Sequence, residues 1–119
     1  MGVQIDIQGR MLIATPMGEI DHHSAESLRD QVDRAFEQSN CRHIIFNFSR
    51  VTFMDSSGIG MIIGRYKNAE KRGGKLAIAG MNDDMNRLFM ISGLSKIVTR
   101  KTTMQEALQV LDKGDSYGE

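Results

Sequence analysis

The sequence has few of the features that would tie it to an oxidising compartment or a membrane. Cys41 is the only cysteine, so a disulfide within the chain and a cysteine-based metal site are excluded, and a single free thiol is typical of a reducing compartment. The apolar runs are far shorter than the ~18 residues of a transmembrane helix. Residues 1–6 lack the basic and apolar regions of a secretory signal. We therefore expect a cytoplasmic protein without a membrane partner.

The chain also lacks an excess of charge of either sign. Lys and Arg number 15, Asp and Glu number 15, and the formal net charge is +0 at pH 7. No overall field attracts nucleic acid or an anionic membrane. A local basic cluster falls in the last turns of an expected helix, where cations complement the helix dipole; it comprises Arg65, Lys67, Lys71, Arg72 and Lys75. We expect no nucleic-acid partner.

The familiar enzyme motifs are missing. Gly58, Gly60 and Gly64 lie within an expected helix and do not form the dinucleotide fingerprint. The sequence contains no GxxxxGK[ST] loop, and no GxSxG elbow surrounds Ser56 or Ser57. We expect a protein that is not an enzyme and holds no cofactor of its own.

Residues 21–24, Asp-His-His-Ser, contain the letters of a hydrolase triad. Neighbours in a chain rarely point at one another, and a triad is recognised by its geometry. Two adjacent histidines without a third ligand at helical spacing are also a weak metal site, so we expect no metal. A hydrolase with Ser56 as nucleophile, supported by Asp21 and His22, is the alternative from another functional class.

The order of expected elements predicts an α/β fold. Alternating apolar residues at the start, followed by a second apolar run, predict an antiparallel hairpin. The expected strands cover residues 3–7, 11–17, 43–48, 75–79 and 97–99. The expected helices begin after Ser24 as N-cap, at about Ser57, at Asn82 or Asp83, and at a capping box of Thr102 and Gln105. Strands and helices that alternate after a hairpin favour a largely parallel sheet covered by helices.

The length of 119 residues favours one domain, because folded domains usually contain roughly 50 to 250 residues. We assign residues 1–112 to that domain. The polar residues 113–119 are expected to form a frayed tail.

The most informative segment is Phe53 to Gly60, where a strand is followed by a helix. Ligand sites of open α/β sheets lie in such loops, and the free N–H groups of a helix N-terminus receive phosphate well. Asp55, Ser56 and Ser57 are all cap-type residues. One cap of ~1 kcal/mol is sufficient for a helix, so the run favours a functional role. A purely capping role stays open at this point.

The helix after this loop has two contrasting faces. Its expected core stripe consists of Ile59, Ile62, Ile63 and Tyr66. The opposite face is uncharged and carries an exposed Met, with Gly60 at its border; it consists of Ser57, Met61, Gly64 and Asn68. Such a surface suits close approach by another protein. Alternatively, the glycines only let this helix pack near its neighbours.

Three segments resemble the STAS-domain anti-sigma-factor antagonists. They are Gly18 to His23, Met54 to Gly60, and Arg87-Leu88-Phe89 with Ser92-Gly93-Leu94. The resemblance covers nearly the whole chain in order and spacing. Its most specific part is the Asp-Ser-Ser-Gly element that begins at Asp55, and the His-His pair favours the sporulation branch, of the sigma-F pathway, over the stress-response branch.

The resemblance implies a STAS-like mixed β-sheet with an N-terminal hairpin, flanked by about four α-helices. It also implies partner switching in the regulation of transcription. The unphosphorylated antagonist binds an anti-sigma factor, which is also a serine kinase of the histidine-kinase-like ATPase fold, and this frees the sigma factor. The kinase supplies ATP and magnesium and phosphorylates Ser56, which ends binding. A serine phosphatase restores the antagonist.

By the same resemblance, Asp21 lies near Ser56 and contacts the kinase. The full set expected to bind the partner is Asp21, Asp55, Ser57, Gly58, Gly60, Met61 and Gly64. A scaffold domain of the same fold in a stress-signalling complex is a further alternative.

Overall fold

The computed structural model describes residues 1–117, with side chains up to residue 111. The chain opens with strands β1 (Val3–Gln8) and β2 (Met11–Pro16), which pair antiparallel. Gly9 lies in the turn with a φ of 61°, a left-handed conformation that glycine adopts at little cost. The predicted N-terminal hairpin is confirmed.

The main sheet has five strands in the order β1-β2-β4-β6-β7. The strands that follow the hairpin are β4 (His43–Asn47), β6 (Leu76–Ala79) and β7 (Thr99–Lys101). From β2 to β7 every neighbouring pair is parallel, and only β1 runs the other way. The expected mixed sheet is thus confirmed.

A second, two-stranded sheet was not expected from the sequence. It joins β3 (Gly18–Ile20) and β5 (Val51–Met54) in parallel. Both strands are too short to show a clear alternation of apolar and polar residues, which is the signal that identifies a strand in a sequence. Each of them leads directly into a helix.

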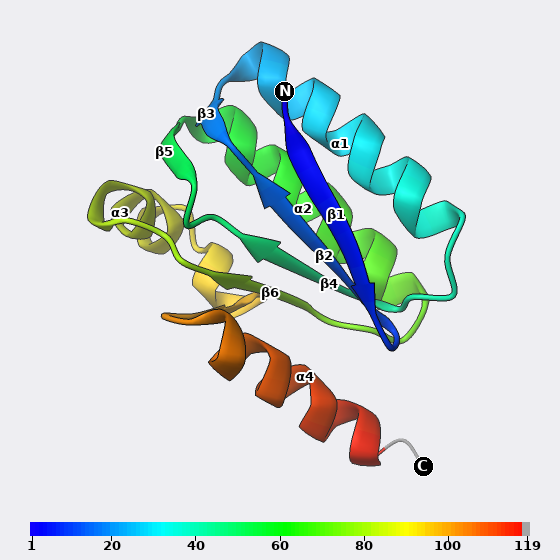
Figure 1. Cartoon of the computed structure of the whole chain (residues 1–119). Helices are drawn as coiled ribbons and strands as arrows, with labels where there is room; N and C mark the ends of the chain where they lie inside the picture. Colours follow the sequence, from blue (N-terminus) through cyan, green and yellow to red (C-terminus); the bar gives the residue numbers. More distant parts are fainter. Residues whose placement is uncertain (118–119) are drawn as a thin grey trace.

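Helices cover both faces of the main sheet (Figure 1). They are α1 (His22–Glu37), α2 (Ser56–Lys71), α3 (Asp83–Ile91) and α4 (Met104–Tyr117), with a short 3-10 turn η1 at Leu94–Lys96. In Figure 1, α1 and α2 lie side by side on one face, whereas α4 lies on the other. This arrangement confirms the predicted α/β class.

The alternation of side chains divides the core between the two faces. Sheet residues that pack beneath the first three helices are Leu12, Ala14, Ile44, Phe46, Leu76 and Ile78. The intervening residues Met11, Ile45, Ala77 and Ala79 pack with Ala107 and Leu111 of α4. Because both faces of β4 and β6 are covered, these strands are apolar nearly throughout, as interior parallel strands are.

Some element boundaries differ from the expectation by a few residues. The N-cap of α1 is Asp21 and not Ser24, which lies at the third helical position. The last strand is Thr99–Lys101 and not 97–99. Capping of α4 uses Thr103, whose Oγ1 accepts a hydrogen bond from the N–H of Glu106 at 3.2 Å, so the expected capping box was placed one residue too early.

The C-terminal helix continues to Tyr117, beyond the domain boundary expected at residue 112. Residues 118 and 119 lie outside the described residues, and the frayed tail stays a prediction. Among residues 1–117, no helix is long and apolar enough to cross a membrane.

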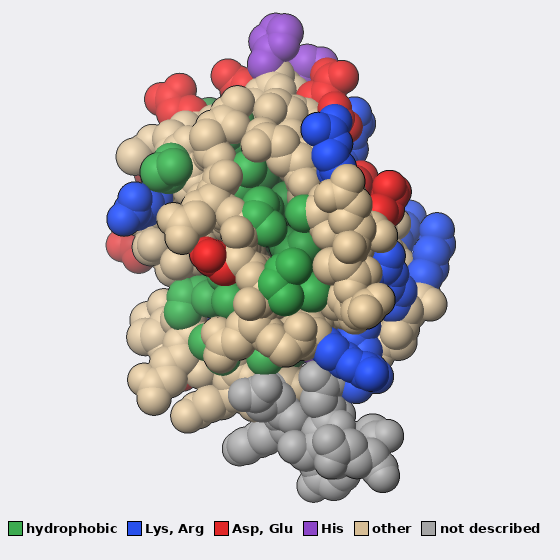
Figure 2. All heavy atoms as spheres, turned by 45° about the vertical axis from the view of Figure 1, so that its right-hand side comes forward, with side chains coloured by type: hydrophobic (Ala, Val, Ile, Leu, Met, Phe, Trp, Pro, Cys, Tyr) green, Lys and Arg blue, Asp and Glu red, His purple; other side chains and the backbone are tan. Residues whose placement is uncertain are grey.

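Figure 2 shows charged side chains of both signs around a central hollow in which hydrophobic side chains gather. Histidines project at the top of this view. His43 is buried, whereas His22 and His23 are exposed, so these histidines mark the start of α1. Charges of both signs on the surface match the formal net charge of +0.

Gly74 should be indispensable for stability. A Cβ at this position would overlap the carbonyl oxygen of Arg42, so we expect Gly74→Ala to lower the free energy of unfolding by about 3 kcal/mol, as overpacking does. Gly64→Ala is the matched control, because nothing lies within 4 Å of its Cβ position and alanine favours a helix interior by about 0.5–1 kcal/mol. Chemical denaturation measures both; equal midpoints for Gly74→Ala and the wild type would contradict the prediction.

Candidate functional site

The parallel pairing of β3 with β5 brings two helix N-termini to one edge of the molecule. Ile20 pairs with Met54, and the backbone N–H of Asp55 donates to the carbonyl oxygen of Ile20 at 3.1 Å. The next residue after each strand caps a helix: Asp21 caps α1 and Asp55 caps α2. The structure thus places Asp21 and Ser56 at the same edge.

The start of α1 is held by a capping box. Oδ1 of Asp21 accepts a hydrogen bond from the N–H of Ser24 at 2.9 Å, and the N–H of Asp21 donates to Oγ of Ser24 at 2.8 Å. Oγ of Ser24 also donates to the carbonyl oxygen of Glu19 at 2.7 Å. The bonds from the backbone and then the side chain of Ser24 lower the pKa of Asp21, so this exposed carboxyl is negatively charged at neutral pH.

The start of α2 leaves one serine free. Oδ1 of Asp55 accepts a hydrogen bond from the N–H of Ser57 at 2.8 Å, which satisfies one of the free donors of the first turn. Ser56 is the first residue of the helix and is exposed. Within the described part of the chain its hydroxyl has no hydrogen-bond partner. The hydroxyl is therefore accessible, at a helix end that favours added negative charge.

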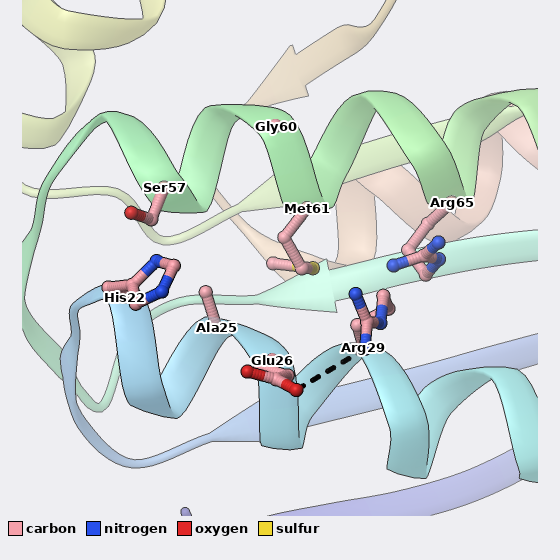
Figure 3. A pocket seen from close by; sticks show the side chains of 8 residues that line it. All are labelled: His22, Ala25, Glu26, Arg29, Ser57, Gly60, Met61 and Arg65. Carbon is pink, nitrogen blue, oxygen red and sulfur yellow. Dashed lines mark ion pairs between the residues drawn. The ribbon is translucent and has the colours of Figure 1, made fainter.

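The two adjacent serines differ in their access to solvent. Ser57 is half-buried, and Figure 3 shows its side chain pointing from α2 towards His22 of α1. It lines a groove between the two helices. Of the two serines only Ser56 is exposed, so an enzyme that approaches from solvent reaches Ser56 first.

Two glycines of α2 leave its backbone open to approach. Gly60 is exposed and Gly64 is half-buried, and no atom lies within 4 Å of the Cβ position of either. Neither glycine is therefore required for packing against a neighbouring helix. The alternative explanation of these glycines, close packing within the fold, is excluded at both positions.

Gly58 and Met61 do not lie where the sequence placed them. Gly58 is buried, and a Cβ there would collide with the side chain of Met54, so this glycine serves packing and not the outer surface. Met61 is 5% exposed and lies between α1 and α2 (Figure 3). The expected exposure of Met61 was wrong because α2 packs against both the sheet and α1. Two neighbours bury a wider stripe of the helix surface than one would.

Arg65 is a residue whose position the sequence analysis missed. It was counted in a local basic cluster in the last turns of the helix, but it is 7% exposed, and its Nε lies 2.8 Å from Oδ1 of Asp33 on α1. Burial lowers the pKa of Arg65 and raises the pKa of Asp33, and the attraction between the two opposes each shift. The sequence does contain a signal for the burial of Arg65. Arg65 lies four residues after Met61 and four residues before Ala69, so all three share one face of the helix.

The Asp-His-His-Ser segment does not form a triad. The carboxylate of Asp21 is bonded to Ser24, so it does not orient a histidine. The rings of His22 and His23 lie 6.0 Å apart at the exposed start of α1. Among the described residues, no group of three or more His, Cys, Asp or Glu side chains could hold a metal ion.

This geometry has counterparts in known proteins. The profile of the STAS domain matches residues 2–107. The anti-sigma F factor antagonist of Paenibacillus polymyxa is 40% identical over 100 residues, which are 82% of this chain and 86% of that protein. The chain belongs to the STAS-domain anti-sigma-factor antagonists. The resemblance noted from the sequence is thereby confirmed.

Two solved structures support the same fold for this STAS domain. The anti-sigma factor antagonist SpoIIAA in its unphosphorylated form matches with a TM-score of 0.81 and 30% identity, over 94% of this chain and 97% of that one. The Bacillus cell fate determinant SpoIIAA in the phosphorylated form matches with a TM-score of 0.70 and 32% identity, over 91% and 97%. Both forms of that relative therefore share the architecture described above.

The cap of α1 predicts a dependence of stability on pH. In the folded state the pKa of Asp21 is lowered from its ordinary value of 3.8. The charged carboxylate therefore stabilises the folded state above the ordinary value, and this stabilisation is lost as pH falls through the folded pKa. Asp21→Asn keeps a capping side chain but cannot ionise. We expect the wild type to have the higher melting temperature at about pH 6 and the difference to vanish near pH 2. A difference that stays constant between these values would contradict this role.

Proposed function

We propose that this STAS domain, in its unphosphorylated form, binds an anti-sigma factor, thereby frees a sigma factor, and is switched off by phosphorylation of Ser56. The observation that carries the proposal is the exposed hydroxyl of Ser56, which has no partner among the described residues and lies at the N-terminus of α2. Membership of a family with a relative solved in phosphorylated and unphosphorylated forms supports it. The 40% identity to the anti-sigma F factor antagonist of Paenibacillus polymyxa favours the sporulation branch, of sigma-F antagonists.

The proposed partner is both anti-sigma factor and serine kinase, of the histidine-kinase-like ATPase fold. This assignment follows the family resemblance. The kinase supplies ATP and magnesium, and Ser56 contributes only the acceptor hydroxyl. A serine phosphatase returns the protein to its binding form.

The surface that meets the partner, here named the docking face, consists of the two helix caps and the open side of α2. Its residues are Asp21, Asp55, Ser56, Ser57, Gly60 and Gly64. The glycines let a partner approach the helix backbone closely, and the carboxylates at one end attract a basic group. Gly58 and Met61 lie behind this face and support it from below.

The switch works by charge, without refolding. A phosphate on Ser56 adds about −1.5 to −2 charges, which the N-terminus of α2 accommodates with about 0.3–2 kcal/mol in favour. The same phosphate lies beside the carboxylate of Asp55 and at the same edge as Asp21. Burying it unpaired against a partner costs several kcal/mol, and each 1.4 kcal/mol is a factor of ten in affinity.

We infer a cytoplasmic regulator that is not itself an enzyme and needs neither nucleic acid nor a membrane. The competing hydrolase with Ser56 as nucleophile needs a base in contact with that hydroxyl. Since the hydroxyl has no hydrogen-bond partner among residues 1–111, and Asp21 bonds to Ser24, the geometry favours the regulator.

Substitutions of Ser56 test the switch. We expect Ser56→Ala to bind the anti-sigma factor like the wild type and to resist phosphorylation, whereas Ser56→Asp should bind at least tenfold more weakly because it adds a charge to the docking face. Ser57→Ala is the matched control and should still be phosphorylated. Mass spectrometry after incubation with the kinase and ATP locates the phosphate; modification of Ser57 would refute the assignment.

Gly60 tests the docking face independently of the phosphate. Its Cβ position is open, so Gly60→Glu should leave the melting temperature nearly unchanged while a charged side chain blocks close approach. We expect the dissociation constant of the anti-sigma factor complex to rise at least a hundredfold, about 2.7 kcal/mol. Gly60→Ala, with a single added methyl group, should bind more tightly than Gly60→Glu. An unchanged dissociation constant for Gly60→Glu would remove Gly60 from the interface.

A further inference from the structure

A hollow beside the edge of the main sheet combines apolar and positively charged side chains. It has a volume of about 360 Å³ and is lined by Met90 of α3 and by residues 95–100, which run from η1 into β7. Met90 is 60% exposed and Ile97 is 46% exposed. Large apolar side chains that line an exposed hollow together are typical of a surface that another molecule covers. None of these residues belongs to the docking face.

The positive charges of this hollow are not neutralised by the chain itself. Lys96 and Arg100 line it and are exposed, and no Asp or Glu is among the lining residues. Among residues 1–111, neither cation forms an ion pair or a hydrogen bond. By contrast, Arg29 on α1 and Arg65 on α2 each face a carboxylate. The hollow therefore favours a negatively charged occupant.

The backbone beside the hollow is also free to bind. β7 is the last strand of the main sheet and pairs only with β6, where Thr99 lies opposite Ala77 and Lys101 opposite Ala79. Besides this pairing, no backbone hydrogen bond among the described residues reaches Thr99–Lys101. An edge strand presents a row of N–H and C=O groups on its open side, and an extended peptide can pair with them as a further strand.

A purely protective role of the cations does not account for the whole hollow. Charged side chains on an edge strand prevent pairing with other chains, and Arg100 and Lys101 repel a second copy of β7 in this way. An edge that is only protected, however, gains nothing from the exposed side chains of Met90 and Ile97 beside it. The same cations attract an acidic strand, so the charge selects which kind of strand binds.

We propose that the β7 edge, together with Met90, Lys96, Ile97 and Arg100, is a second docking site, which binds an extended acidic segment of a partner protein. The segment adds to β7 as a strand, places an apolar side chain against Met90 and Ile97, and places carboxylates beside Lys96 and Arg100. This site shares no residue with the docking face. Its failure would therefore not affect the proposed switch at Ser56.

A capped peptide, Glu-Glu-Val-Val-Glu-Glu-Val-Val, tests the site, because each face of it as a strand carries both residue types. Added to the full chain, it should shift the NMR signals of the backbone amides of residues 96–101. We expect a dissociation constant of about 0.1–1 mM, since a short edge offers few hydrogen bonds. Replacing Glu by Gln should weaken binding at least threefold. N-methylation of the valines, which removes N–H donors that a strand needs, should abolish it.

Two results of this peptide series would overturn the proposal. If the N-methylated peptide binds as well as the parent, the peptide does not add to β7 as a strand. If the parent peptide shifts no amide of residues 96–101, the β7 edge is not a docking site for acidic segments.

Substitutions in the chain locate the site. Arg100→Glu reverses an exposed charge and should weaken peptide binding at least tenfold. Lys67→Glu is the matched control on an exposed position of α2 and should bind like the wild type, as should Ser56→Asp. Unchanged binding by Arg100→Glu overturns the proposal. Equal weakening by Lys67→Glu would show a response to overall charge, and loss of binding by Ser56→Asp would place the peptide on the docking face; both also overturn it.

The same NMR signals distinguish two other occupants of the hollow. Shifts of residues 96–101 that grow with protein concentration, without peptide, would identify a second copy of the chain. Line broadening of these residues by vesicles that contain phosphatidylserine, but not by vesicles of phosphatidylcholine alone, would identify a lipid surface. Either result would overturn the proposal in favour of that occupant.

Discussion

The functional edge of this STAS domain depends on the pairing of two short strands, β3 and β5. The hydrogen bond from the N–H of Asp55 to the carbonyl oxygen of Ile20 fixes their register at the point where both strands end. Because the strands are parallel, the helices that follow them start side by side. A shift of one residue would turn every side chain of a strand to its other face and would separate the two caps from each other.

The caps explain how one phosphate can change binding without changing the fold. Asp55 is tied to the N–H of Ser57 and Asp21 to that of Ser24, so neither carboxylate is free to swing away from an added phosphate. The free N–H groups of the first helical turn stabilise negative charge on the protein side. The added phosphate therefore repels a partner that approaches from outside, while the fold of the domain stays unchanged.

The contact between α1 and α2 sets which side chains of α2 a partner can meet. It buries Met61 and Arg65, leaves Gly60 exposed, and forms the groove between the two helices. The ion pair of Arg65 with Asp33 joins the two helices. Since a buried pair is sensitive to the loss of either partner, this contact ties the shape of the docking face to the packing of the core.

The sequence alone determined the α/β class, the N-terminal hairpin, the interior strand β4 and the special character of the segment around Ser56, because periodicity, cap residues and glycines are local signals. It did not reveal β3, β5 or the burial of Gly58, Met61 and Arg65. Those depend on contacts between segments far apart in the chain: a three-residue strand shows no period, and a helix face is buried or exposed according to its neighbours. Only the tertiary structure decided which side of α2 faces α1 and which remains open.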